Sequence, residues 1–217
     1  MPTLKEQRVM MVDTQVRPSD VTKFPIIDAM LSVERERFVP AAARSTAYSD
    51  CGLAMGQGRQ MLEPRVLAKA LDLLDVQPNE FVLTVGAGLG YTVALLARLA
   101  EAVVALEEDE DFASDAESQL GETGADNVAV VTGSLVAGAE AMGPFDVILI
   151  DGGVEVLPDE LAAQLKDGGR IVAIFVEGAL GVCRLGLKSA GHITWRDAFN
   201  ASAEILPGFE REEAFQL

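Results

Sequence analysis

The chain of 217 residues has only two cysteines, one histidine and one tryptophan. The cysteines, Cys51 and Cys183, are too few for a disulfide framework, and with His192 they lack the spacing of a metal site. We therefore predict no bound metal and a reduced, cytoplasmic location.

Positive charge is also scarce, because 17 basic residues face 34 acidic ones and give a formal net charge of −17. No cluster of Lys and Arg offsets this excess, so the chain should repel a phosphate backbone. Long apolar runs are missing too: the most apolar stretch is interrupted by Arg98 and Glu101, and the amino terminus lacks the apolar centre of a signal peptide. These features predict no nucleic-acid partner, no membrane partner and no export.

What the chain does have is apolar content, 49% of its residues, which is enough for one sizeable core. No linker divides it, so we predict a single domain over residues 1–217, made of an amino-terminal part (1–75) and a core (76–217). Helical spacing of apolar residues predicts helices over 4–16 and 20–33. The stretch from 35 to 65 predicts an ordered loop region, and the next helix should begin near Pro64 and run to Leu74.

From Glu80 onward, short apolar runs alternate with longer helical ones, which is typical of a βαβ series. Nearly continuous apolar strands such as "VILI" and "IVAIF" suit a parallel sheet covered on both faces. We predict an α/β, doubly wound, mostly parallel sheet. After Glu177 looser spacing predicts antiparallel strands in "VCRLGLKSA", "HITWRDAF" and "FEREEAF".

The first strand-to-helix turn of this series, "VGAGLGY", is rich in glycine. In an open α/β sheet the ligand lies beyond the carboxyl ends of the strands, where a side chain would block close approach. A dinucleotide fingerprint, G-x-G-x-x-G, would need glycine at the position of Tyr91, so NAD is disfavoured. The G-x-G-x-G pattern of Gly86, Gly88 and Gly90 instead resembles the nucleoside-binding loop of S-adenosylmethionine-dependent methyltransferases.

The second strand, "VVALE", ends at Glu107, which follows four apolar residues. A carboxylate at this position can accept hydrogen bonds from the hydroxyls of a ribose. We therefore predict that Glu107 binds a nucleoside. The acidic residues that follow it, 108–111, are interpreted as the solvated start of a helix, where negative charge suits the helix dipole.

Several segments together resemble the protein-L-isoaspartate O-methyltransferase family. They are "VRPSDVTKFPIIDAMLSVERERFVPAAARSTAYSD", "MGQGRQMLEPRVLAKAL", "LTVGAGLGYTVALLA" and "GPFDVILIDGG", followed by "LPDELAAQLKDGGRIVAIF". The resemblance runs in order from about residue 15 to residue 176. It implies a Rossmann-like class I methyltransferase fold, S-adenosyl-L-methionine as methyl donor, and an isoaspartyl carboxylate in a damaged protein or peptide as acceptor.

The resemblance also indicates which residues form the site. It places the donor against Gly86, Ala87, Gly88, Gly90, Glu107, Ser134 and Asp151, and the acceptor against a loop that includes Arg59, Gln60 and Leu62. The family pattern in this loop is G-x-G-Q-T-I-S-x-P, and here Gln60 replaces the Thr and Leu62 replaces the Ser credited with catalysis. Thr84 replaces an acidic residue before the glycine turn, and Ser134 replaces an aspartate.

These departures leave two functions open. One is a carboxyl methyltransferase, in which no general base is needed because a carboxylate is already ionised at neutral pH. The other is a non-catalytic nucleoside-binding or regulatory member of the same fold. Arg59 bears on the choice: its guanidinium could grip an acceptor carboxylate bidentately, or it could be an ordinary exposed arginine without a site role, as most surface charges are.

Overall fold

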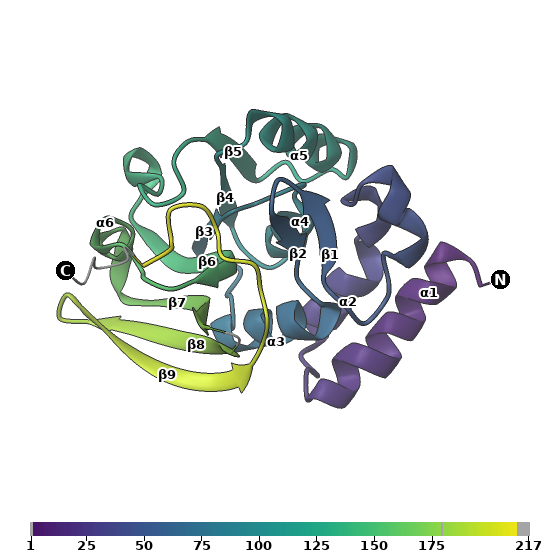
Figure 1. Cartoon of the computed structure of the whole chain (residues 1–217), viewed down its shortest axis with the longest axis horizontal. Coiled ribbons are helices and arrows are strands. Elements are labelled where there is room, and N and C mark those ends of the chain that lie inside the picture. Colours follow the sequence, from purple (N-terminus) through teal and green to yellow (C-terminus); the bar gives the residue numbers. More distant parts are fainter. Residues whose placement is uncertain (1, 179, 212–217) are drawn as a thin grey trace, which may run out of the picture.

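The computed structural model describes residues 2–178 and 180–211, which contain a seven-stranded sheet at the centre of an α/β fold (Figure 1). The first five strands in the sheet order are parallel to one another, and each of the last two is antiparallel to the strand before it. In that order they are β5 (Val128–Thr132), β4 (Ala102–Glu107), β3 (Phe81–Val85), β6 (Phe145–Val154), β7 (Leu165–Glu177), β8 (Leu180–Ser189) and β9 (His192–Asn200). The predicted mostly parallel sheet with antiparallel strands near its end is confirmed.

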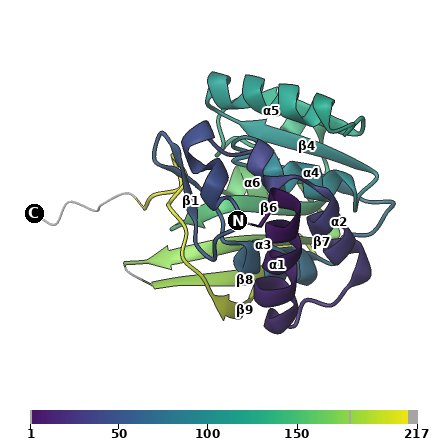
Figure 2. The same ribbon diagram turned by 90° about the vertical axis from the view of Figure 1, so that its right-hand side faces the viewer.

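Both faces of the sheet are covered, because consecutive strand residues contribute to two separate cores. Val82 packs into the core of one face and Leu83 into that of the other. The first core is completed by α1 (Leu4–Met11), α2 (Phe24–Ser32), α3 (Pro64–Leu74), α4 (Tyr91–Ala97) and α5 (Glu110–Glu122), and the second by α6 (Asp159–Ala163). Figure 2 shows α1 and α2 next to α3, on the side of the sheet where the first core lies. Within the described ranges, no helix has the length and apolar character needed to cross a bilayer.

The amino-terminal part differs from the sequence prediction in two places. The helix predicted over 4–16 continues as a π-helical segment, Val12–Val16, and the ordered loop region contains a hairpin of β1 (Leu53–Gly56) and β2 (Arg59–Met61). These strands of four and three residues are too short to produce a visible alternation. Of "FEREEAF", residues 209–211 are not in a strand, and 212–215 lie outside the described residues.

The position of β3 decides where a ligand can bind. The chain runs from β3 outward to β4 and β5, and then returns to the other side of β3 to form β6. This reversal is a topological switch point, and it opens a crevice at the carboxyl ends of β3, β4 and β6. The loops that follow these strands therefore meet at one edge of the sheet.

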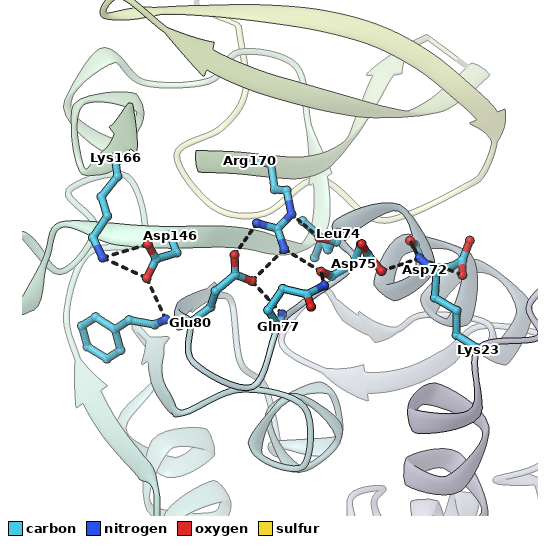
Figure 3. Close-up of polar contacts among 10 residues, drawn as sticks. Lys23, Asp72, Leu74, Asp75, Gln77, Glu80, Asp146, Lys166 and Arg170 are labelled. Carbon is cyan, nitrogen blue, oxygen red and sulfur yellow. Dashed lines mark hydrogen bonds and ion pairs between the residues drawn. The ribbon is translucent and has the colours of Figure 1, made fainter. Parts of the chain in front are cut away.

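The opposite edge is held by a network of charged side chains (Figure 3). Arg170 of β7 donates to both carboxylate oxygens of Glu80, each at 2.7 Å, just before β3 begins. Asp146 of β6 accepts from the backbone N–H of Phe81 at 2.9 Å and from Lys166. These contacts fix the amino ends of three neighbouring strands, far from the crevice.

Candidate active site

The glycine turn after β3 forms the floor of the crevice. Gly86, Gly88 and Gly90 have φ angles of 81°, 54° and 96°, a region that L side chains rarely adopt. The backbone N–H groups of Gly86 and Ala87 donate to the carbonyl of Leu106 at 2.9 and 3.1 Å, which ties the turn to the end of β4. A Cβ atom at Gly88 would meet nothing within 4 Å. The turn therefore exposes backbone to whatever occupies the crevice.

Glu107, the last residue of β4, has a fully buried carboxylate at this turn. Three backbone N–H groups donate to it: Gly88 at 2.7 Å, Glu108 at 2.9 Å and Asp109 at 3.2 Å. Such donors fix the orientation of the carboxylate. Glu107 is therefore a rigid acceptor at the position where the sequence predicts a ribose contact.

Arg59, on β2, binds the same carboxylate. Its Nη1 lies 2.8 Å from Oε1 of Glu107 and its Nη2 lies 3.1 Å from Oε2, and its side chain is only 7% exposed. The reading as an ordinary exposed arginine is therefore wrong for this structure, because the bidentate pair with Glu107 draws the guanidinium inward. A carboxylate offers about four lone-pair sites, and the five donors now on Glu107 fill them.

Two cavities are lined in part by Arg59. The inner one measures about 20 Å³, roughly the space of one water molecule, and the outer one about 370 Å³. Arg59 borders both. Besides Arg59, the inner cavity is lined by Met55, Gln60, Met61, Gly86, Ala87, Gly88, Leu89, Tyr91, Thr92 and Asp151, and the outer one by Gln57, Glu108, Asp109 and Pro207.

The carboxyl-terminal segment, residues 201–211, narrows the crevice from a second direction. It runs back across the ends of β3 and β6 (Figure 1), where the N–H of Leu206 donates to the carbonyl of Gly153 and the N–H of Gly153 donates to the carbonyl of Glu204. A Cβ built on Gly86 would lie 2.9 Å from Cδ1 of Leu206 and 2.9 Å from Nη2 of Arg59. Sequence reasoning missed Leu206, because nothing in the local pattern of this segment indicates that it returns to the glycine turn.

Asp151 of β6 lies on the wall of the inner cavity. It is half-buried, and its Oδ1 is sealed from solvent with no hydrogen-bond partner among the described residues. Burial raises the pKa of its carboxyl group to about 6, against the opposing effects of a hydrogen bond from Thr92 and the positive charges of Arg59 and Arg35. Asp151 is therefore an unsatisfied acid that faces the same space as the glycine turn.

The other predicted site residues are more scattered. Gln60 borders the inner cavity and lies against the backbone of Gly52, whereas Leu62 is 2% exposed in the first core and does not line either cavity. Ser134 is exposed on the loop after β5, outside both cavities. Thr84 is fully buried in β3, and its Oγ1 has no hydrogen-bond partner.

Sequence reasoning also missed Arg35, which lies beneath the loop that precedes α3. It is completely buried, donates to the carbonyls of Ala47 and Leu62 at 2.8 and 2.7 Å, and stacks on the ring of Tyr91 at 4.8 Å from its centroid. Arg35 thus connects the segment that carries the β1–β2 hairpin to the first residue of α4.

A glycine turn after one strand and a buried carboxylate at the end of the next, at the switch point of this sheet, define a class I methyltransferase fold. Residues 6–192 match the protein-L-isoaspartate(D-aspartate) O-methyltransferase (PCMT) family, and the chain belongs to that family.

Individual relatives agree with this assignment. The chain is 38% identical over 172 residues to a protein-L-isoaspartate O-methyltransferase of Syntrophus aciditrophicus, covering 79% of each chain. It is 34% identical over 186 residues to the enzyme of the same name from Koribacter versatilis, covering 86% of this chain and 84% of the relative.

Solved structures agree on the fold. A protein-L-isoaspartate O-methyltransferase structure superposes with a TM-score of 0.82 at 22% identity, over 95% of this chain and 66% of that one. The structure of a Plasmodium falciparum chain in complex with S-adenosyl-L-homocysteine superposes with a TM-score of 0.78 at 18% identity, over 95% of this chain and 99% of that one.

Proposed function

We propose that this chain transfers a methyl group from S-adenosyl-L-methionine to the carboxylate of isoaspartyl residues in damaged proteins or peptides. The observation that carries the proposal is the rigid Glu107 carboxylate beside the glycine turn, in a chain of this family. The partner is the damaged protein or peptide, without nucleic acid or membrane, and the compartment is the cytoplasm.

The residues at the crevice fit a nucleoside donor if Arg59 turns aside. Glu107 is oriented by three backbone donors to accept from ribose hydroxyls, and a Cβ at Gly88 would meet no atom within 4 Å, whereas the side chain of Leu206 lies against Gly86. Ser134, on the loop after β5, and Asp151, in the carboxyl-terminal half of β6, lie toward the same edge, and we assign them to the donor side with Ala87 and Gly90. When bound, the donor supplies a methyl group activated by its sulfonium charge.

The chain's own residues have a limited chemical task. An acceptor carboxylate is ionised at neutral pH, so the site must align it and keep water away, without taking a proton from it. Met55, Met61 and Leu89 give the inner cavity an apolar wall that suits the second requirement. We assign the first requirement to Arg59 and Gln60, which border the cavity.

A second candidate function is a nucleoside-binding or regulatory member without methyl transfer. The observation in its favour is that Leu62 and Gln60 supply no hydroxyl, and that Leu62 is turned into the core. Loss of one well-placed donor typically lowers a rate by about 10²-fold. This candidate predicts nucleoside binding without turnover.

One pair of experiments separates these functions. S-adenosyl-L-homocysteine is titrated into the parent chain by calorimetry, and radiolabelled methyl transfer is measured on an isoaspartyl peptide and on its aspartyl counterpart. We expect binding, and transfer to the isoaspartyl peptide only. Binding without transfer would support the second candidate, and neither binding nor transfer would refute both.

Glu107→Ala tests the ribose assignment. Hydrogen bonds to a charged group contribute about 1.5–3 kcal/mol each, so we expect S-adenosyl-L-homocysteine to bind at least about tenfold more weakly. Glu117→Ala is the matched control, because Glu117 is an exposed residue of α5 and loses the same charge. Unchanged affinity in Glu107→Ala would show that the ribose binds elsewhere.

A further inference from the structure

The guanidinium of Arg59 occupies the position that a ribose needs. Both of its terminal nitrogens are on Glu107, and the three backbone donors fill the remaining capacity of that carboxylate. A ribose hydroxyl can therefore bind Glu107 only by displacing Arg59. The same movement opens space, because Arg59 lines both the inner cavity of about 20 Å³ and the outer one of about 370 Å³.

The charges around the crevice indicate what the displaced guanidinium of Arg59 would bind, which is the carboxylate of the acceptor. Among the described residues that line the two cavities, Arg59 is the one Lys or Arg, whereas Glu108, Asp109 and Asp151 are acidic, and the buried Glu107 lies next to them. An incoming carboxylate meets a negative field there, and Arg59 is the one counter-charge that the described lining residues offer it. While that charge is paired with Glu107, it is not available to an acceptor.

The β1–β2 hairpin is built in a way that permits such movement of Arg59. Its two strands pair only with each other, outside the seven-stranded sheet. Its turn holds Gly56 and Gly58 at φ angles of 97° and 68°, and a Cβ at either glycine would touch nothing within 4 Å. The hairpin tip, residues 56–58, is exposed, so the backbone just before Arg59 can move although the Arg59 side chain itself is buried.

We propose that Arg59 exchanges between two carboxylates: it is held by Glu107 until the ribose of the donor displaces it, and it then binds the carboxylate of the acceptor. This inference rests on the proposed function and adds an order of binding to it, with the donor before the acceptor. Binding of the two ligands is coupled through one side chain. By linkage, the acceptor strengthens donor binding by the same factor as the donor strengthens acceptor binding.

Arg59→Gln is the variant that tests the exchange. Its amide is neutral and shorter, so it cannot hold both oxygens of Glu107 or neutralise an acceptor carboxylate. We expect S-adenosyl-L-homocysteine to bind at least about tenfold more tightly than to the parent, because no pair has to be broken. In the same variant an isoaspartyl peptide should bind at least about tenfold more weakly in the presence of S-adenosyl-L-homocysteine.

Coupling is measured directly by titrating the isoaspartyl peptide with and without S-adenosyl-L-homocysteine. The parent should show a gain of about tenfold in peptide affinity when the nucleoside is present, within the range usual for coupled sites, and Arg59→Gln should show none. Arg65→Gln is the matched control: it removes the same charge from the start of α3, where Arg65 pairs with Glu63 at 3.3 Å outside both cavities.

The outcomes distinguish this inference from the proposed function. If the parent and Arg59→Gln bind S-adenosyl-L-homocysteine equally well and the parent methylates the peptide, the exchange is wrong and the function stands. If neither protein binds the nucleoside, both are wrong. Should Arg59→Gln fail to fold, Arg59→Lys keeps the charge without the bidentate pair, and an unchanged nucleoside affinity in that variant overturns the exchange.

Discussion

Replacement of Asp151 by Asn should make the protein more stable at neutral and alkaline pH, and leave its stability unchanged in acid. The Oδ1 of Asp151 is sealed from solvent without a hydrogen-bond partner, and burial raises the pKa of the carboxyl group from its ordinary value of 3.8 to about 6. The charge of Glu107 raises this pKa further, whereas Arg59 and Arg35 oppose the rise. An amide at this position has no charge to desolvate.

The sign and size of the effect follow from linkage. Below pH 3.8 the carboxyl group is protonated in both the folded and the unfolded chain, so it costs nothing. As pH rises from 3.8 to about 6, only the unfolded chain loses the proton, and the free energy of unfolding falls. Above pH 6 the loss is complete; a shift of about two pKa units corresponds to at most about 3 kcal/mol.

Urea unfolding of the parent and Asp151→Asn at intervals from pH 4 to pH 8 measures this difference. Other acidic groups titrate in both proteins, and their contributions cancel in the comparison. Asp115→Asn, on the exposed side of α5, is the control and should change the free energy of unfolding by less than about 0.5 kcal/mol at every pH. A difference between parent and Asp151→Asn that is independent of pH would refute the reasoning.

Two further predictions concern opposite edges of the sheet. Arg170→Met removes the bidentate pair with Glu80, in which the side chain of Arg170 is 17% exposed and that of Glu80 is 16% exposed. This variant should lower the free energy of unfolding, measured in urea, by about 2 kcal/mol and leave the affinity for the nucleoside unchanged. A concurrent loss of nucleoside affinity would show that the two edges are coupled. Gly86→Ala forces a Cβ into a turn with φ of 81°, 2.9 Å from atoms of Arg59 and Leu206, and should weaken nucleoside binding at least about tenfold by calorimetry. Equal affinity would mean that the donor does not approach this turn.

The parts of the site that could be predicted from the sequence depend on local pattern and one rule of topology. Alternating apolar strands and helices predict the parallel sheet, and the carboxyl ends of neighbouring parallel strands meet at one edge. The glycines at 86, 88 and 90 and the carboxylate of Glu107 each stand directly after such a strand, so the sequence is enough to bring them together. The contact of 2.7 Å between the Gly88 N–H and Glu107 is the result.

The parts that could not be predicted depend on contacts between distant segments. Arg59 and Glu107 are 48 residues apart, and nothing in the sequence around either residue indicates the other. The pairing requires the β1–β2 hairpin, whose strands are too short to be recognised by their periodicity. Leu206 reaches Gly86 only because the carboxyl-terminal segment folds back onto β6, which is again a tertiary contact.

The structure also separates the substitutions in "GQGRQMLEP", which appear equivalent in the sequence. Leu62 is a packing residue: its side chain is buried in the first core and its carbonyl accepts a hydrogen bond from Arg35, so an apolar group is what its surroundings require. Gln60 borders the inner cavity but carries no charge. Arg59 borders both cavities and is the one cation among their described lining residues, three of which are acidic. Because an acceptor carboxylate is recognised mainly by its charge, the choice of acceptor should depend on Arg59 more than on the two missing hydroxyls.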